Sequence, residues 1–368
     1  MHHSNALLTG QKKNVLSIGT DEKIFDPASS VRRRVRRYAQ GFNSFHIICK
    51  TRKKFPVEKF ENITLYSVSP RFRPMFFGQM YAVGKGILRS SSQWVITAED
   101  PFETGLAGWL LAQKFGIHLQ VQVHTDIFSP YFRRHSLANY IRYLIALFVL
   151  PRANCIRVVS ARIGNSLEAI GISPRKITIL PIWNVFSSEF PHKKVTDDIF
   201  TVLFVGRLEK EKGGEVALEA FNHFLSLGGK GKLIFVGAGG EEEYLREKAK
   251  SLSTSVQFAG WQYDVLPYYL KADALLSTSF YDGWGMAAAD AVSLGVPVVM
   301  TDVGLAGEAV IDGVNGFVRP VGDITGLGEA LFRIYQDPKI LPMNHSKISS
   351  IQSFEEYAAQ YQELLRSS

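Results

Sequence analysis

Two aspartates with seven residues between them are the clearest candidates for binding chemistry in this sequence. Asp282 stands in a Gly-rich turn directly after an apolar run, and Asp290 stands on the Ala-rich helix expected to follow. Gly283 and Gly285 let the backbone approach a ligand closely, and their amides lie at the start of that helix, where they can donate to sugar hydroxyls or phosphate. We therefore predict a ligand that carries both groups. The alternative is that Asp282 is only a turn residue and Asp290 only a helix-surface residue.

Two basic residues form a second candidate site after the strand expected at Thr201–Gly206. Arg207 and Lys212 lie in the loop between that strand and the next helix. Unpaired amides and the helix dipole favour phosphate at a helix start, and a guanidinium binds phosphate oxygens in pairs. We predict that both residues bind a diphosphate, although loop residues of this kind are often only solvated. Gly237 and Gly239 follow another strand and match only part of a dinucleotide fingerprint, so a tight strand–helix turn is the alternative there.

The chain that must position these residues has 368 residues, which exceeds the usual size of a single core and favours two domains. Hydrophobic residues make up 46% and charged residues 21%, as in a soluble globular protein. The net charge of +8 favours an anionic partner, such as a nucleotide, a nucleic acid or an acidic membrane, and a merely basic surface fits equally well. Cys49 and Cys155 lie in apolar runs and are expected to be buried reduced thiols, which fits a cytoplasmic protein.

Short β-rich runs alternate with helical patterns along the whole chain. Most runs are continuously apolar, as in parallel strands buried on both faces of a sheet, and we expect seven in the first half and six in the second. We therefore predict an α/β fold with two Rossmann-like domains that face each other across a cleft. The expected units are an N-terminal domain at 1–190, a C-terminal domain at 191–352 and a last amphipathic helix within 353–368.

Several ordered motifs together resemble the group 1 family of retaining, nucleotide-sugar-dependent glycosyltransferases. They are Gly206-Arg207-Leu208 with Lys212-Gly213, Val236-Gly237-Ala238-Gly239, Phe258-Ala259-Gly260, and the run SFYDGWGMAAADAVSLGVPVVMTDVG that begins at Ser279. The resemblance covers the second half strongly and the first half loosely. It implies a GT-B architecture, in which the C-terminal domain holds the donor nucleotide and the N-terminal domain the acceptor. It also implies that the last helix, Ser353–Arg366, crosses back to the first domain.

The resemblance assigns roles to the candidate residues. Arg207 and Lys212 would bind the donor diphosphate and stabilise the departing nucleotide. Asp282 would occupy the first acidic place of the E-x7-E motif and contact the donor sugar, and Asp290 would occupy the second, at the ribose. Aspartate replaces glutamate at both places, so the donor sugar must sit differently or the activity is weaker. The remaining donor-binding residues would be Gly237, Gly239, Gly283, Trp284, Gly285 and Met286.

A helix is also expected at Gly304–Ile311, where Gly304 and Glu308 match the glycine and acid that follow in the family. In the first half, His124 ends a strand and resembles the family's histidine that faces the donor sugar; a lone histidine is more often structural.

Three acids are acceptor-side candidates. Asp100 or Glu103 would touch an acceptor hydroxyl, with a helix cap as the equal alternative, and Asp126 follows shortly after His124.

The resemblance implies a mechanism without metal or cofactor. The acceptor would approach on the face from which the phosphate leaves, and the leaving phosphate would act as the base. The expected partners are a nucleotide-sugar donor and a glycan or lipid-linked acceptor. Alternatives are a GT-B epimerase or hydrolase, and a non-catalytic sugar-nucleotide binding protein whose shortened acids no longer support transfer.

Arginines surround the apolar helix expected at Leu137–Leu150 and would suit peripheral contact with an anionic membrane or a phosphorylated lipid. A core helix with solvated arginines is the alternative. We expect no transmembrane helix, because the most hydrophobic window, Tyr140–Pro151, is too short and contains Arg142. We also expect no signal peptide, because residues 1–14 lack a continuous apolar core. No nucleic-acid partner is expected, because no known reader motif is present.

Overall fold

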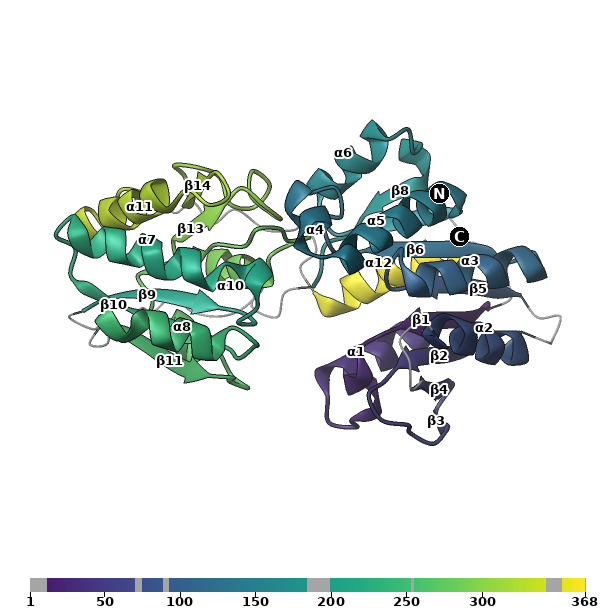
Figure 1. Cartoon of the computed structure of the whole chain (residues 1–368). Coiled ribbons are helices and arrows are strands. Elements are labelled where there is room, and N and C mark those ends of the chain that lie inside the picture. The colour runs from purple at the N-terminus through teal and green to yellow at the C-terminus, as the bar shows by residue number, and fades with distance from the viewer. Residues whose placement is uncertain are drawn as a thin grey trace, which may run out of the picture.

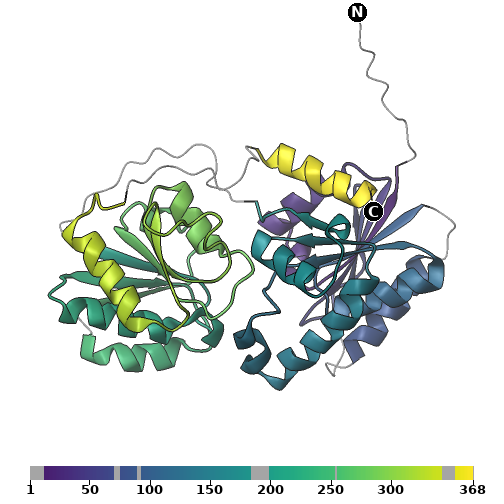
Figure 2. The same ribbon diagram turned by 90° about the horizontal axis from the view of Figure 1, so that it is seen from above.

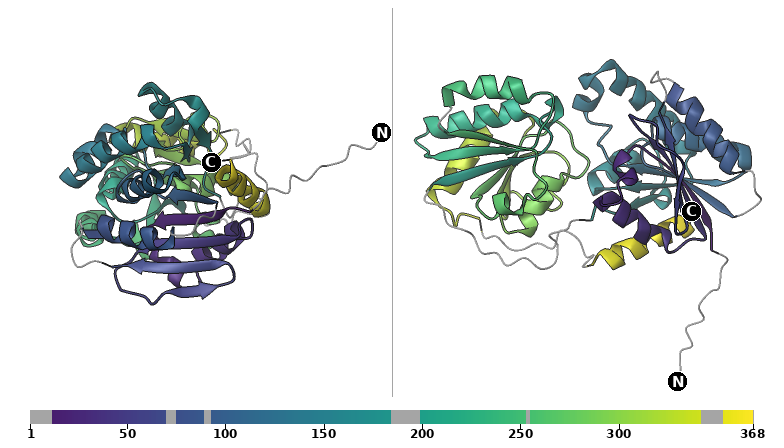
Figure 3. Two further views of the ribbon diagram at one scale, coloured as in Figure 1. Left: turned by 90° about the vertical axis from the view of Figure 1, so that its right-hand side faces the viewer. Right: turned by 90° about the horizontal axis from the view of Figure 1, so that it is seen from below.

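The computed structural model describes residues 12–69, 75–88, 93–183, 199–252, 255–341 and 353–367. The chain forms two α/β units side by side, each a sheet with helices on both faces (Figures 1 and 3). This confirms the predicted fold of two Rossmann-like domains. The connection expected between them falls largely on residues 184–198, which lie outside the described residues.

The first sheet has eight strands in the order β3-β4-β2-β1-β5-β6-β7-β8. All neighbours are parallel except β3, which runs antiparallel to β4. The strands are β1 (Asn14–Gly19), β2 (Ser44–Lys50), β3 (Glu58–Phe60), β4 (Ile63–Val68), β5 (Trp94–Ala98), β6 (His118–Val123), β7 (Cys155–Val158) and β8 (Ile177–Ile179). Seven match predicted strands, whereas β3 is a three-residue edge strand without an apolar pattern.

Six α-helices cover this sheet within the described part of the chain. They are α1 (Ser30–Ala39), α2 (Met75–Ile87), α3 (Glu103–Phe115), α4 (Pro130–His135), α5 (Leu137–Val149) and α6 (Ala161–Ala169). Side-chain caps explain several starts: Ser29 accepts from the Arg32 amide at α1, and Ser160 accepts from the Ile163 amide at α6. The six-residue α4 was not predicted, because it is too short to show a helical period.

The second sheet has six parallel strands in the order β11-β10-β9-β12-β13-β14. The strands are β9 (Phe200–Val205), β10 (Gly231–Val236), β11 (Val256–Gly260), β12 (Ala274–Ser277), β13 (Val298–Thr301) and β14 (Gly316–Arg319). The α-helices are α7 (Gly214–Ser226), α8 (Glu242–Lys248), α9 (Leu266–Tyr269), α10 (Met286–Ser293) and α11 (Ile324–Gln336).

The strand order places a switch point in each sheet. In the first sheet β1 lies between β2 and β5, and in the second β9 lies between β10 and β12. Loops leave in opposite directions at such a point and open a crevice at the carboxyl ends of the strands. The residues that follow β1 and β5, and those that follow β9 and β12, are therefore placed to bind ligands.

The helix predicted at Gly304–Ile311 is wrong. The segment forms turns closed by a bridge between Ala306 and Val310. Gly304 and Gly307 have φ angles of +56° and +78°, which a right-handed helix cannot contain. The spacing of small apolar residues in this segment resembles that of a helix, but its two glycines form turns. The chain packs back onto Trp284, whose carbonyl accepts from the Leu305 amide at 2.9 Å.

The last helix, α12 (Phe354–Arg366), lies against α1 of the first unit rather than against the second (Figure 2). The ring centroids of Tyr361 and Tyr38 lie 4.4 Å apart, and the side-chain amide of Gln122 donates to the Tyr361 hydroxyl at 3.0 Å. The chain thus returns to its first domain. Across the described ranges, no helix has the length and apolar character needed to cross a membrane, and Cys49 and Cys155 are free thiols.

Candidate functional site

The loop after β9 is fastened to the end of β12. Gly213 has φ +66°, and a side chain there would collide with the carbonyl oxygen of Thr278. The Thr278 hydroxyl donates to the carbonyl of Gly213 at 2.8 Å. This close packing brings Lys212, one residue earlier, beside the turn that carries Asp282.

Lys212 and Asp282 form an ion pair. The Nζ of Lys212 donates to Oδ2 of Asp282 at 2.5 Å, while Oδ1 accepts from the Gly283 amide at 2.9 Å. Both side chains are only about one-fifth exposed. Lys212, which was predicted to bind phosphate, and Asp282, which was predicted to bind the donor sugar, are therefore in direct contact.

Arg207 lies in the same loop as Lys212, directly after Gly206. Its guanidinium pairs with Glu211 at 2.7 Å, and 68% of its side chain is exposed. The backbone of Glu211 is fixed, because its carbonyl accepts from the Phe280 amide at 2.8 Å. Because the Arg207 side chain is largely exposed, its ion pair with Glu211 is weak, and the guanidinium can turn toward a phosphate at little cost.

The turn after Asp282 contains two glycines, Gly283 and Gly285, which have different structural roles. Gly283 lies so close to His124 of the first domain that a side chain would collide with the His124 carbonyl. Gly285, at φ +93°, precedes Met286, the first residue of α10, and no side chain caps that helix. The first amides of α10 are therefore open to an anion. Trp284 is buried, with 3% exposed, so it supports the turn and does not wall an open pocket.

Asp290 is half-buried on α10. Its carboxylate accepts no hydrogen bond from any side chain or amide in the described ranges, and burial raises its pKa to about 7. An isolated carboxylate in such a place costs stability unless a ligand supplies donors. Two adjacent hydroxyls are suitable donors.

Gly237 and Gly239 hold two loops together. A side chain at Gly237 would collide with the carbonyl of Gly206, and one at Gly239 would collide with the carbonyl of Leu208. The Leu208 amide also donates to the carbonyl of Ala238 at 3.0 Å. The geometry therefore gives both glycines a role in placing the loop that carries Arg207.

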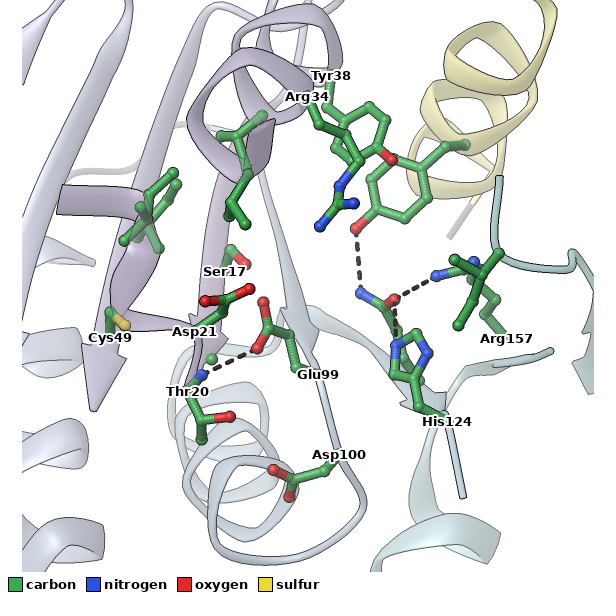
Figure 4. Close-up of a pocket in the computed structure, with 18 of the residues that line it drawn as sticks. Ser17, Thr20, Asp21, Arg34, Tyr38, Cys49, Glu99, Asp100, His124 and Arg157 are labelled. Atoms are coloured by element: carbon green, nitrogen blue, oxygen red, sulfur yellow. Dashed lines mark hydrogen bonds between the residues drawn. The ribbon is translucent and has the colours of Figure 1, made fainter. Parts of the chain in front are cut away.

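The switch point of the first sheet opens into a cavity of about 420 Å³. It lies at the ends of β1, β5 and β6 and is closed on one side by α1 and α12 (Figure 4). Among the predicted residues, His124 and Asp100 line it. Glu103 instead pairs with Arg142 at 3.3 Å, and Asp126 caps a turn by accepting from the amides of Phe128 and Ser129 at 3.1 and 3.2 Å.

His124 is held neutral. Its Nε2 lies 3.2 Å from Oε1 of Gln122, and burial lowers its pKa to about 3, with Arg157 and Arg34 adding to the effect. A neutral imidazole beside the Gly283 contact can donate or accept a hydrogen bond where the domains meet. It cannot supply a positive charge there.

Glu99 is the acid that the sequence analysis passed over. It directly follows β5, its Oε2 accepts from the Thr20 amide at 2.9 Å, and its carboxylate lies over Gly19, where a side chain would leave no room for it. Burial raises its pKa to about 7, and the neighbouring Asp100 and Asp21 add to the shift. Its position as the first residue after a strand beside the switch point was the available signal.

The two domains also touch at a second place. Arg162 of α6 pairs with Asp302 and donates to the carbonyl of Ala306 at 3.1 Å. The carboxylate of Glu308 accepts from the Ala161 amide at 2.7 and 3.0 Å. The acid that resembles a family position thus caps a helix of the opposite domain.

Two family models match the chain in succession. Residues 28–183 match the glycosyl transferase 4-like domain, and residues 186–350 match the glycosyl transferases group 1 model. The glycogen synthase of Mycobacterium tuberculosis is 31% identical over 141 residues, which are 37% of this chain and 34% of the synthase. The chain therefore matches about a third of that relative's length.

Solved structures with the same architecture cover nearly the whole chain. A sucrose-phosphate synthase from Thermosynechococcus elongatus superposes with a TM-score of 0.76 at 20% identity, covering 96% of this chain and 99% of its own. The Anabaena protein HepE, in complex with UDP and glucose, superposes with a TM-score of 0.71 at 18% identity, covering 97% of this chain and 100% of its own. At these identities the likeness shows the fold alone.

Proposed function

Because the chain belongs to the group 1 glycosyltransferases of GT-B fold, we propose that it transfers a sugar from a nucleotide diphosphate sugar to a hydroxyl of a glycan or lipid-linked acceptor, with retention of configuration. The pairing of Lys212 with Asp282 carries this proposal. It joins a diphosphate ligand and a sugar ligand at the turn where the donor domain touches His124 of the other domain. A sugar–phosphate bond held there lies between the two domains.

The donor site supplies positive charge where negative charge develops. Lys212, Arg207 and the open amides of α10 surround the position of the diphosphate, and Asp290 receives the ribose hydroxyls. Preorganised donors of this kind stabilise a leaving oxyanion strongly. The UDP named in the HepE structure supports a nucleoside diphosphate as the donor's leaving part.

The transfer step balances without another reactant. The bond between the anomeric carbon and the phosphate oxygen breaks, and its electron pair stays on the phosphate. The acceptor oxygen bonds to the same face of that carbon, and its proton passes to the leaving phosphate. We assign no metal and no cofactor to the step, because Lys212, Arg207 and the helix amides supply the charge.

A membrane-facing surface is part of the proposal. Large apolar side chains are exposed along one stripe of α5: Leu137, Tyr140, Ile141, Leu144 and Phe148. Arg134 and Arg152 are exposed near its two ends. An apolar stripe flanked by arginines fits an anionic bilayer surface, and a lipid-linked acceptor would be met there.

The experiment is incubation with a panel of nucleotide sugars, with and without glycan and lipid-linked acceptors. Acceptor-dependent nucleotide release is expected, and NMR of the product should show the donor's anomeric configuration. Release without an acceptor would identify a hydrolase. An altered donor sugar would identify an epimerase, and tight binding without turnover a sugar-nucleotide binding protein.

A further inference from the structure

Arg34 reaches into the first-domain cavity from α1. Three other arginines of α1 are engaged elsewhere, since Arg32 pairs with Glu58, Arg36 with Glu61 and Arg37 with Glu355, and Arg33 is exposed. Arg34 forms no hydrogen bond and no ion pair with any described residue, and it lines the cavity. Figure 4 shows its guanidinium entering from α1.

Arg157 adds a second guanidinium to the same cavity. It is 4% exposed and donates only to neutral groups: the carbonyls of Leu180 and Pro181, Oε1 of Gln122 at 2.7 Å and the hydroxyl of Tyr357 at 2.6 Å. No carboxylate pairs with it among the described residues. Hydrogen bonds to neutral groups do not cancel the positive charge of Arg157. This charge, together with that of Arg34, lowers the pKa of His124.

Among the described residues, the carboxylates of the cavity accept from backbone amides and form no ion pair with these two arginines. Asp21 accepts from the Lys23 amide at 3.2 Å, and Glu99 accepts from the Thr20 amide. Burial raises the pKa of Glu99 to about 7 and that of Asp100 to about 6, and the charge of Arg34 opposes the shift at Glu99. They are suited to hold hydroxyls on the wall opposite Arg34.

The remaining wall is aromatic. The ring centroids of Tyr38 and Tyr361 lie 4.4 Å apart with the rings tilted, and Tyr357 and Trp183 complete this side of the cavity. A space of about 420 Å³ lies in the range of small-molecule sites. Hydroxyl-binding acids, ring-sized aromatic faces and an unpartnered arginine converge on one volume.

We propose that this cavity binds an acceptor whose sugar or polyol ring carries a phosphate or carboxylate group, with Arg34 as the direct ligand of that anion. A guanidinium binds both anions through two parallel hydrogen bonds. Arg157 raises the local positive potential without leaving its own partners. The identification of the ligand as an acceptor rests on the proposed function.

The test is calorimetric titration of the whole protein, without nucleotide, with glucose 6-phosphate, glucuronate and glucose. At least one anionic probe should bind about tenfold more tightly than glucose, and Arg34→Gln should weaken that binding about tenfold or more. Arg33→Gln is the matched control: it removes the same charge from the adjacent, exposed position of α1 and should change the affinity less than about twofold. Which probe binds distinguishes phosphate from carboxylate.

Three results would overturn the inference: equal binding of charged and neutral probes, no binding of either anion, or equal losses in both arginine variants. Arg207→Gln separates this inference from the proposed function. It should weaken nucleotide-sugar binding and leave the anionic probe unaffected. If probe binding instead follows Arg207, the anion occupies the donor site and the inference fails, while the transferase proposal stands. If no nucleotide sugar reacts but the Arg34 dependence holds, the transferase proposal fails and the anion site remains.

Discussion

Gly283 of the second domain lies directly against the carbonyl oxygen of His124 in the first, at a distance that leaves no room for a side chain. The contact joins the end of β6 to the turn that carries Asp282. Because the proposed donor-binding residues and the proposed acceptor cavity belong to different domains, we expect this contact to determine whether a donor sugar and an acceptor can meet.

Gly283→Ala should therefore hold the domains apart. We expect kcat to fall about tenfold or more, since the added methyl must displace backbone of the opposite domain. Nucleotide-sugar affinity should change less, because Lys212 and Asp282 belong to one domain. Gly78→Ala, at an exposed position with open space around it, is the control and should retain full activity. Normal kcat in Gly283→Ala would show that this contact is absent during turnover.

Lys212 should matter far more than its neighbour Lys210. Lys212→Met removes a charge beside the leaving diphosphate and leaves Asp282 unpaired, so kcat/KM should fall about 100-fold to 1,000-fold. Lys210→Met removes the same charge from an exposed residue of the same loop and should have little effect. Steady-state kinetics of both variants decide the matter. Equal losses of kcat/KM in the two variants would show that Lys212 contributes only to the overall positive charge of the loop.

Donor affinity should depend on pH through Asp290. Burial raises its pKa to about 7 in the free protein, whereas an unfolded aspartate titrates near 4. The folded state therefore holds the extra proton between about pH 4 and 7, so this group makes the free protein less stable as pH rises through that interval.

If Asp290 binds the ribose hydroxyls as proposed, these donors favour its ionised form, so donor binding should strengthen as pH rises. Affinity for a nucleotide sugar should fall about tenfold from pH 8 to pH 6, as a site with this pKa becomes protonated. Titration calorimetry of the wild type and of Asp290→Asn measures this. A variant that retains the full pH dependence would assign it to another group.

Gly213→Ala should destabilise the second domain. Gly213 and Gly116 have nearly the same backbone conformation, with φ of +66° and +63°, but only Gly213 has a carbonyl in the place of its missing side chain. Gly116→Ala should cost about 1–2 kcal/mol of unfolding free energy from conformation alone. Gly213→Ala should cost more, because Thr278 must also move. Denaturant unfolding compares them, and equal costs would contradict the collision.

The apolar stripe of α5 should bind anionic vesicles. The wild-type protein is expected to sediment with vesicles containing phosphatidylglycerol and much less with phosphatidylcholine alone, and binding should weaken with salt. Ile141→Ser with Leu144→Ser should abolish it. Val57→Ser, at another exposed apolar residue of the first domain, should not. Binding unchanged in the double variant would exclude this face as the contact.

Much of the fold was predictable because it depends on local patterns. Continuous apolar runs indicate parallel strands, and all thirteen runs in this sequence are strands in the structure. Two of the elements that were not predicted correctly also have local causes. Strand β3 is too short to show a pattern, and the segment after Gly304 combines turn-forming glycines with small apolar residues at a helix-like spacing. The site is harder to predict. Glu99 and Glu103 both follow β5 closely in the sequence, and only the directions of their side chains in the structure show that Glu99 is the one at the cavity.

The sequence by itself determined that Asp282, two glycines and an uncapped helix start form one turn, because those residues are neighbours in the chain. The tertiary structure determines which residues from other parts of the chain contact that turn. Lys212 reaches Asp282 because Gly213 can pack on Thr278, and His124 reaches Gly283 because neither domain places a side chain between them. Arg34 and Arg157 likewise enter one cavity from α1 and β7. Parallel strands bring distant segments to a common edge, and contacts at that edge depend on sheet order, which no spacing along the chain records.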